Sequence, residues 1–451
     1  MTAPCLLPIA DLARRMAARE ISSVEATRTC LDVIAERDAD LHAFITVLTD
    51  DALAEASRAD ADFAAGRCRG PLHGVPISLK DLIDVAGVPT TAASRVRAGF
   101  TASRDAVIVT RLRRAGAVII GKCNLHEFAF GTTGEESAFG RTRHPADPSR
   151  SPGGSSGGSA VSVATGMAFA SIGTDTGGSV RIPAAACGCV GLKPTFGEIP
   201  MGGIVPLSRS LDHVGPLART VGDTRLIFDA LRGSRPAARE TDRLEPAALR
   251  LGLPGDDLMD VLDDGVRAEF KRALAALRGA GASIDAVRLP HAAAAAAMYL
   301  AIQLPEASAY HGATLERQPH DYQPGVRQRL ELGRYVLAED YVRAQRGREV
   351  LRCEVDRALG GRDALVLPTL PIPAPRFGDQ VVHIGAGAEP IRALMLRLTQ
   401  PFNLTGHPAI SLPCGTTAGG LPCGLQLVGR INRTDGLLAA AEACEEALRS
   451  A

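Results

Sequence analysis

Apolar residues recur near the start of the chain with the spacing of amphipathic helices. The segments ADLARRMAARE, SVEATRTCLDVIAERDA and DDALAEASRADADFAAG each place apolar side chains three or four positions apart. Either Ser22 or Ser23 can supply the N-cap of the second segment. We therefore expect three amphipathic helices within residues 9–66.

A different pattern begins near residue 71, where short apolar runs are bounded by Gly and Pro. Such runs are typical of buried strands, and here they alternate with helical stretches such as DAVIVTRLRRAG. This alternation predicts an α/β fold, a sheet covered by helices. The predicted strands are VPISL at 75–79, AVII at 117–120 and FASIGT at 169–174, followed later by LRLGLP, ASIDAVRLP, DALVLP, PAISLP and LPCGLQLVG.

The placement of these strands bears on the number of domains. The polar, Pro-containing segment 233–245 is a candidate linker, but a surface loop explains it equally well. Strands are predicted on both sides of it, and a final helix is expected from about Thr434. We predict a single domain over residues 1–451, in which the part from about 246 to 451 completes the sheet begun at about 71–225.

Composition and charge narrow the class of partner. Lys plus Arg and Asp plus Glu number 50 each, so net charge gives no reason to expect a nucleic acid or an anionic membrane as partner. No apolar run reaches the roughly 18 residues of a membrane span, and the N-terminal sequence lacks the order of a secretory signal. We expect a cytoplasmic protein that acts on a small molecule.

The most unusual segment is Gly153–Ser159, GGSSGGS, because glycines are costly to order. A flexible linker is one explanation. However, an apolar helical segment follows directly, and a second Gly-rich turn, DTGGS at 175–179, comes one helix and one strand later. We expect the two turns to face one another. In the second turn, consecutive backbone N–H groups before Ser179 could form an oxyanion hole, with a purely structural turn as the alternative.

A nucleophilic serine needs a base. The histidines offer no obvious base with an acid partner except His213 beside Asp212, and sequence neighbours are poorly placed to point at one another. Lys80 follows the predicted strand VPISL, where a side chain would be presented at the rim of the sheet. An ordinary lysine there is a solvated or paired ammonium. As a base it would need a pKa lowered from about 10.4 to about 7–8 by burial.

Together, VPISLKD, GGSSGGS and GTDTGGSVRIPAAACGCVGLKPT resemble the amidase signature family of serine hydrolases. Ser179 lies 24 residues after Ser155 and 99 after Lys80, as in that family's pattern. The resemblance extends over most of the chain, through AVIIGKCNLHEFAFG to NLTGHPAISLPCG and LPCGLQLVGR. It implies a mixed β-sheet covered by helices on both faces, and hydrolysis of amide-type C–N bonds without a cofactor.

The resemblance also implies a role for individual residues. Ser179 would be the nucleophile, Ser155 a bridging serine that follows a cis peptide bond, and Lys80 the base. The residues expected to supply backbone N–H groups to the oxyanion are Thr176, Gly177, Gly178 and Ser179. Those expected to support the loops through hydrogen bonds are Ser156, Asp175 and Arg181.

Three other motifs are weaker. GSSGG fits the G-x-S-x-G elbow with Ser156 as nucleophile, but no apolar strand precedes it. GAVIIGKC nearly matches a phosphate-binding loop but ends in Cys123 rather than Ser or Thr. Neither Cys187 with Cys189 nor His126 with Glu127 has metal-ligand spacing, and we expect no metal.

Within the resemblance, two functions compete. A stand-alone amidase would act on aryl or alkyl amides or on carbamates (urethanes), with esterase side activity. The alternative is the glutaminase A subunit of a tRNA-dependent amidotransferase, in which an acidic residue holds the glutamine amino group; that position falls near Leu396, while a matching basic residue survives as Arg329. Residues 128–140, 299–322 and 367–375 are expected to line the substrate pocket, and family members are often homodimers.

Overall fold

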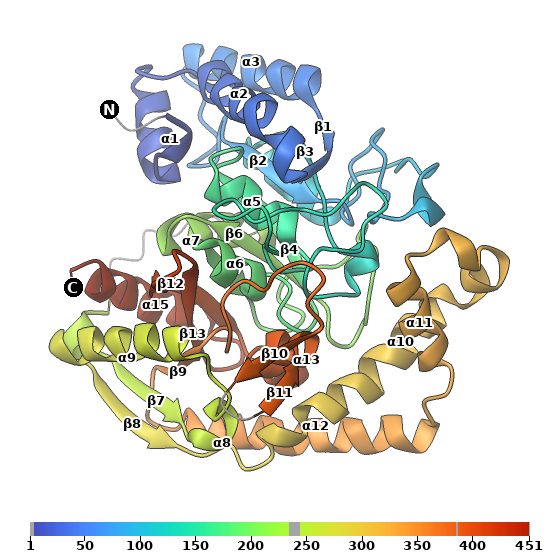
Figure 1. The fold of residues 1–451 in the computed structure, drawn as a ribbon. Coiled ribbons are helices and arrows are strands. Elements are labelled where there is room, and N and C mark those ends of the chain that lie inside the picture. The colour runs from blue at the N-terminus through green and yellow to red at the C-terminus, as the bar shows by residue number, and fades with distance from the viewer. Residues whose placement is uncertain (1–3, 234–243, 385–386, 451) are drawn as a thin grey trace.

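The N-terminal segment folds into helices that pack over one end of a large sheet (Figure 1). The computed structural model describes residues 4–233, 244–384 and 387–450, so most of the candidate linker at 233–245 lies outside the described residues. Ser22 is the N-cap of the second helix: the Glu25 N–H donates to its hydroxyl at 3.0 Å, while the Ser22 N–H donates to the Glu25 carboxylate at 2.7 Å. The three helices are α1 (Ile9–Ala17), α2 (Ser23–Leu41) and α3 (Thr49–Ala64).

The core of the molecule is a mixed sheet of 11 strands in the order β1-β3-β2-β4-β6-β5-β12-β13-β9-β7-β8. A separate hairpin pairs β10 with β11. This arrangement confirms the predicted fold, a mixed sheet with helices on both faces. The strands are β1 (Phe44–Val47), β2 (Pro76–Lys80), β3 (Val118–Cys123), β4 (Ala170–Asp175), β5 (Val190–Lys193), β6 (His213–Ala218), β7 (Arg250–Pro254), β8 (Ser283–Val287), β9 (Ala364–Pro368), β10 (Val381–Ile384), β11 (Gly387–Pro390), β12 (Ala409–Thr416) and β13 (Pro422–Val428).

The sheet joins distant parts of the sequence. β12 runs antiparallel to β5, with Ile410 opposite Leu192, and β13 in turn pairs with β9. Strands from before residue 219 and after residue 250 therefore belong to one hydrogen-bonded sheet. The assignment of a single domain stays a prediction.

Two parallel strands, the third and fourth in the sheet order, position the candidate site. β2 and β4 are neighbours in register, with Leu79 opposite Ile172. Because parallel strands end at the same edge of a sheet, the residues that close these strands, Lys80 and Asp175, emerge side by side. This edge brings the predicted lysine and the second Gly-rich turn together.

Helices cover the sheet, and the longest of them form a separate layer beside it (Figure 1). α5 and α6 follow the two Gly-rich turns. α15 packs against both α7 and α9, and all three pack against the sheet. α10 packs along α11 and α12. Within the described residues, no helix has the length and apolar character that a membrane crossing requires. The remaining helices are α4 (Val107–Arg114), α5 (Gly157–Ala164), α6 (Arg181–Cys187), α7 (Val221–Arg232), α8 (Asp256–Met259), α9 (Asp264–Gly279), α10 (Ala295–Arg317), α11 (Pro324–Gly333), α12 (Ala338–Ala358), α13 (Ile391–Arg397), α14 (Gln400–Leu404) and α15 (Thr434–Arg449).

Candidate active site

Lys80 is the last residue of β2, and its side chain is completely buried. Its Nζ lies 2.7 Å from the Ser155 hydroxyl and 2.8 Å from the Thr174 hydroxyl, and no carboxylate of the described chain forms an ion pair with it. Burial lowers the pKa of Lys80 to about 7, although Asp175 and Asp212 act in the opposite direction. Near neutral pH a large share of Lys80 is therefore an uncharged amine that can accept a proton.

The first Gly-rich turn presents Ser155 to this lysine. The peptide bond between Gly154 and Ser155 is cis, and the Ser155 side chain is fully buried. A Cβ added to Gly154 would lie 3.0 Å from the Gly134 nitrogen and 3.1 Å from backbone atoms of residues 132 and 133. This segment is thus packed tightly against a neighbouring loop, which excludes a flexible linker.

The two Gly-rich turns face one another, as predicted. The Ser156 N–H donates to the carbonyl oxygen of Ser179 at 3.2 Å, which ties one turn to the other. The Ser156 hydroxyl donates to the Thr174 carbonyl oxygen at 3.2 Å, so it also links the first turn to β4. This hydrogen bond agrees with the expectation that Ser156 supports the loops.

Ser179 lies between β4 and α6 and keeps a small exposed fraction of 5%, whereas Lys80 and Ser155 are at 0%. Of these three side chains it is the one with exposed surface. Among the described residues, the backbone N–H groups of Gly177, Gly178 and Ser179 donate to no protein acceptor. Adjacent free N–H groups in front of a reachable hydroxyl are the arrangement that an oxyanion requires.

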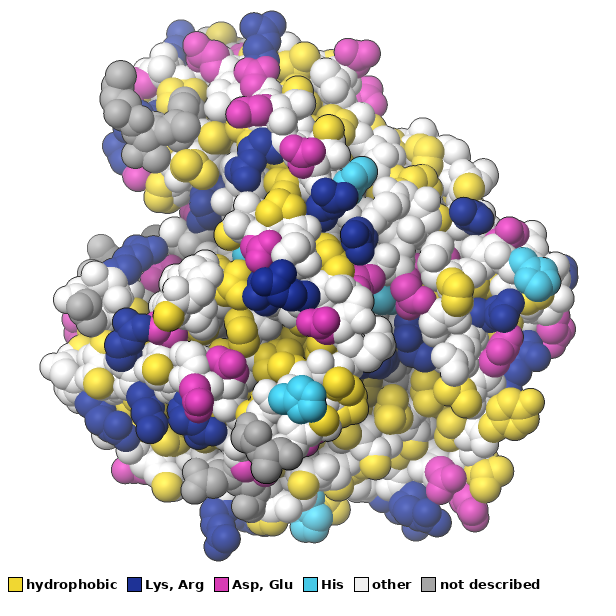
Figure 2. Space-filling model, in the orientation of Figure 1, with side chains coloured by type: hydrophobic (Ala, Val, Ile, Leu, Met, Phe, Trp, Pro, Cys, Tyr) yellow, Lys and Arg dark blue, Asp and Glu magenta, His cyan; other side chains and the backbone are white. Residues whose placement is uncertain are grey.

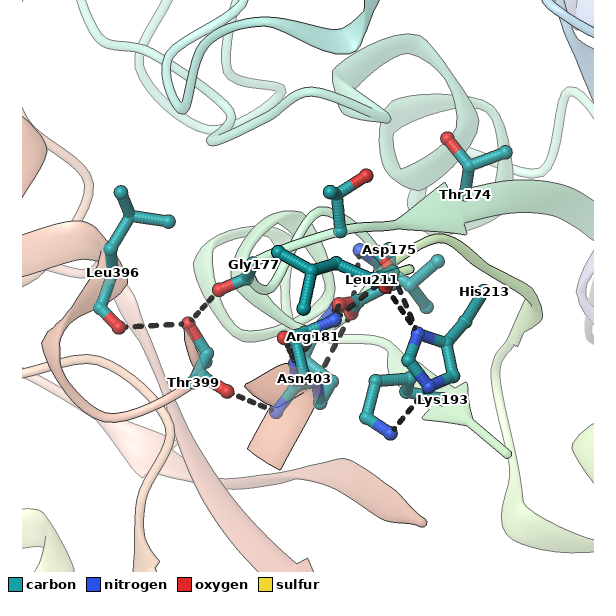
Figure 3. Close-up of polar contacts among 12 residues, drawn as sticks. Thr174, Asp175, Gly177, Arg181, Lys193, Leu211, His213, Leu396, Thr399 and Asn403 are labelled. Carbon is teal, nitrogen blue, oxygen red and sulfur yellow. Dashed lines mark hydrogen bonds and ion pairs between the residues drawn. The ribbon is translucent and has the colours of Figure 1, made fainter. Parts of the chain in front are cut away.

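The second turn is held open by contacts with the C-terminal part of the chain (Figure 3). The Thr399 hydroxyl donates to the Gly177 carbonyl oxygen at 2.6 Å, which fixes that peptide with its oxygen toward Thr399. A Cβ added to Gly177 would lie 2.5 Å from the Tyr299 hydroxyl oxygen and 2.9 Å from Leu396. The glycine is therefore required by the close approach of these two side chains.

A buried ion pair braces the same turn (Figure 3). Arg181 donates to both carboxylate oxygens of Asp175, at 2.9 and 3.0 Å, and both side chains are fully buried. Burial alone would raise the pKa of Asp175, but Arg181, Lys193 and Asn403 hold it well below its usual range. Arg181 also donates to Gln426 at 2.7 Å and to Asn403 at 2.6 Å. The pair thereby connects the turn to α14 and β13.

His213 and Asp212 do not form a Ser-His-Asp arrangement with a serine of the site. Nδ1 of His213 lies 2.7 Å from the Leu211 carbonyl oxygen, and its Nε2 lies 3.3 Å from Nζ of Lys193. Asp212 instead accepts from the Thr176 hydroxyl at 2.7 Å, and burial raises its pKa to about 6. Asp212 thus supports the second turn, a contact that sequence reasoning missed.

Two residues of the weaker sequence motifs form ion pairs within the fold. Lys122, in the near phosphate-loop motif, is a buried residue of β3 that pairs with Asp81 at 2.8 Å. His126 pairs with Glu136 at 3.0 Å. Across the described ranges, no cluster of three or more His, Cys, Asp or Glu residues has a geometry that could hold a metal ion.

Sequence reasoning also missed Thr174, Thr399 and Asn403. Thr174 precedes the predicted Asp175 and shares its strand, so its place near Lys80 could have been found from the pairing of β2 with β4. Thr399 and Asn403 lie more than 220 residues after the turn that they contact. No local sequence pattern marks such long-range partners.

Comparison with known proteins defines the class of this site. The family model described as Amidase matches residues 25–438. An amidase of Pseudomonas putida is 42% identical over 92% of this chain and 90% of its own length. The A subunit of glutamyl-tRNA(Gln) amidotransferase from Anaeromyxobacter dehalogenans (strain 2CP-C) is 40% identical over 98% of this chain and 96% of its own.

A solved amidase structure superposes with a TM-score of 0.92 and 36% identity, and the match covers 98% of this chain and 99% of that chain. The chain therefore belongs to the amidase signature family, whose enzymes hydrolyse amide C–N bonds. The two relatives have nearly the same identity to it, so similarity alone does not choose between an amidase and an amidotransferase subunit.

Proposed function

We propose that this protein is a stand-alone amidase that hydrolyses small linear amides through a covalent acyl-enzyme, with Ser179 as nucleophile, Ser155 as proton bridge and Lys80 as base. The observation that carries the proposal is the buried Lys80 Nζ, which lies 2.7 Å from the Ser155 hydroxyl without a carboxylate partner in the described chain. An ammonium held only for structure would be expected to have such a partner.

The proposed proton path ends in the contact between Ser155 and Lys80. Ser179 Oγ attacks the carbonyl carbon while its proton passes to Ser155 Oγ and the Ser155 proton passes to Lys80 Nζ. The tetrahedral oxyanion accepts hydrogen bonds from the backbone N–H groups of residues 176–179. Collapse breaks the C–N bond, and the amine leaves with a proton returned along the same path. Water then repeats the sequence on the ester of Ser179 and releases the acid.

Two side chains favour a stand-alone enzyme over an amidotransferase subunit. Leu396 lies beside Gly177, near the position where the family resemblance puts the acidic residue that holds the amino group of glutamine. An apolar side chain cannot pair with an ammonium. Arg329, the matching basic residue, is bound to Glu136 at 2.7 Å. On this reasoning no carboxylate is available for the amino group of glutamine, and the arginine for its carboxylate is already paired with Glu136.

The substrates that fit the proposal are aryl amides, short alkyl amides and carbamates, because each presents a carbonyl bonded to nitrogen. Esters would be side substrates, since their leaving groups need less protonation. The relay uses only side chains and backbone of this chain, so the proposal includes no metal or cofactor. The proposal also includes a cytoplasmic location for the enzyme and is compatible with a homodimer.

Release of amine or ammonia from an aryl amide, an aryl carbamate and glutamine tests the proposal. Wild type is compared with Ser179→Ala and with Ser283→Ala, a matched change at an exposed serine of β8. We expect wild type and Ser283→Ala to act on the amide or the carbamate and Ser179→Ala to be inactive. Activity on glutamine alone would instead identify an amidotransferase subunit, and full activity of Ser179→Ala would refute the nucleophile.

A further inference from the structure

A cavity of about 480 Å³ opens next to the turn that carries Ser155. Its walls come from the loop at 131–136, from α11, from residues 379–380 before β10 and from residues 390–392, where β11 meets α13. Thr132 and Thr133 form part of the wall, and their backbone packs on Gly154, where an added Cβ would lie 3.1 Å away. In Figure 2 the surface is hollowed between α10–α11 and the region of α13, with basic and acidic side chains along the hollow.

Most of the charges in this cavity already have partners. Glu136 lies 2.7 Å from Arg329, accepts from the Gly325 N–H at 2.6 Å and pairs with His126. Glu135 accepts from the Thr133 hydroxyl at 2.8 Å and from the Gly378 N–H at 3.0 Å. These carboxylates hold the loop and α11 in place. Glu136 also acts on Arg392 from a distance and raises the pKa of its guanidinium, but forms no ion pair with it.

Arg392 is the exception. Its guanidinium is half-buried and lines the cavity, and among the described residues its polar contact is the Phe130 carbonyl oxygen at 3.4 Å. No carboxylate of the described chain pairs with it, and the exposed Asp379 on the same cavity forms no ion pair with it. Burial and the neighbouring Arg329 lower the pKa of Arg392 to about 10, so the group is charged at neutral pH. A half-buried guanidinium without a directly paired carboxylate keeps N–H donors available for an anionic ligand.

Tyr299 connects this cation to the reacting centre. Its hydroxyl borders Gly177, and the same side chain is near enough to Arg392 to influence the pKa of the guanidinium. Tyr299 is thus a neighbour of both the second turn and Arg392, and a substrate that uses both must pass this side chain.

We propose that Arg392 binds a carboxylate of the substrate, so that the enzyme prefers amides whose acyl or amine part ends in an anionic group. The planar guanidinium can donate two parallel hydrogen bonds to such a group. This inference rests on the proposed function, because it concerns the substrate of the same site. It differs from glutamine recognition through Arg329, which is occupied by Glu136.

Two pairs of matched substrates test it. The 4-nitroanilides of glutaric and pentanoic acids have the same chain length and differ in the terminal carboxylate of the acyl part. In the second pair, 4-acetamidobutanoate and N-butylacetamide differ in the same way on the amine part. Each is assayed with wild type, with Arg392→Gln and with Arg397→Gln. The last variant removes the same charge from the same helix. Arg397 does not line the cavity, and it lies 2.5 Å from Asp260, with which it forms an ion pair.

We expect wild type to favour the anionic member of one pair at least tenfold in kcat/KM. Arg392→Gln should lower that value by about 10- to 100-fold, the range for a hydrogen-bonded charged group, with less than a threefold change on the neutral member. Arg397→Gln should behave as wild type. Equal rates on both members of both pairs, with rapid turnover of the neutral ones, would overturn the inference and leave the proposed function intact.

Binding of glutarate to Ser179→Ala, measured by calorimetry, gives a second readout that does not need turnover. Loss of this binding on adding Arg392→Gln, with an unchanged melting temperature, supports the carboxylate site even if no amide of the panel is hydrolysed. Absence of hydrolysis of every substrate would count against the proposed function alone. Equal binding with and without Arg392, or none in either protein, would overturn the inference.

Discussion

Replacing Lys80 by methionine removes the buried amine and keeps most of the side-chain volume. Two opposing effects determine the stability of this variant. The fall of the Lys80 pKa from 10.5 to about 7 corresponds to about 5 kcal/mol, at 1.36 kcal/mol per unit. The folded state bears this cost below pH 7, because the unfolded chain holds the proton more tightly; it shrinks as pH rises and vanishes above the unfolded pKa.

Methionine removes this cost, but it leaves the hydroxyls of Ser155 and Thr174 without their partner. Each unsatisfied buried hydroxyl costs about 1–3 kcal/mol. The net change in the free energy of unfolding at pH 7 therefore lies between a gain of about 3 and a loss of about 1 kcal/mol. The variant should fold.

Its activity should fall far more than its stability. Loss of a general base reduces kcat/KM by about 10²- to 10⁴-fold. In wild type, kcat/KM on an aryl amide should rise about tenfold per pH unit below pH 7 and level off above it, because the neutral amine of Lys80 is the reactive form. Urea denaturation and the pH profile are measured together, with exposed Lys271→Met as the control. A folded Lys80→Met that retains more than a tenth of wild-type activity, or a wild-type profile flat from pH 5 to 9, would refute the role of the lysine.

Two further variants test the second turn. Arg181→Met leaves the Asp175 carboxylate buried without its ion-pair partner, so urea denaturation at pH 7 should show a free energy of unfolding lower by about 3–5 kcal/mol. The control, Arg14→Met, breaks the exposed pair with Asp11 and should lower it by less than about 1 kcal/mol. Equal losses in the two variants would contradict the reasoning. Gly177→Ala forces a Cβ to within 2.5 Å of the Tyr299 hydroxyl, so kcat/KM should fall by about 10²-fold or more, as expected when an oxyanion donor is displaced. Gly99→Ala, where the added atom meets nothing within 4 Å, is its control, and similar activity of the two variants would show that the turn tolerates displacement.

Local patterns predicted much of the sheet. The apolar runs at 75–79, 117–120 and 169–174 became β2, β3 and β4, and β3 extends further, to Cys123. β6 was missed, because its sequence HVGPLA contains a proline and a glycine, which are uncommon in strands. β1 and β5, each of four residues, are too short for a period to be seen.

The candidate site divides in the same way. The sequence predicted three of its side chains, because each lies in a recognisable local pattern. Lys80 ends a strand, and Ser155 and Ser179 lie in the two Gly-rich turns. The contacts of Thr399 and Asn403 with the second turn depend on the pairing of β12 with β5. Arg392 carried no local signal either, because its lack of a counter-ion is a property of the folded cavity.

Labelling of the nucleophile tests the central claim most directly. The protein is mixed with a slowly deacylating aryl ester at neutral pH, quenched in acid, digested and analysed by mass spectrometry, in parallel with Ser179→Ala and Lys80→Met. The account predicts one acyl adduct per chain, on the peptide containing Ser179, absent from Ser179→Ala and formed at least 100-fold more slowly in Lys80→Met. An adduct on Ser155, Ser156 or another residue, or labelling of Lys80→Met at the wild-type rate, would contradict it.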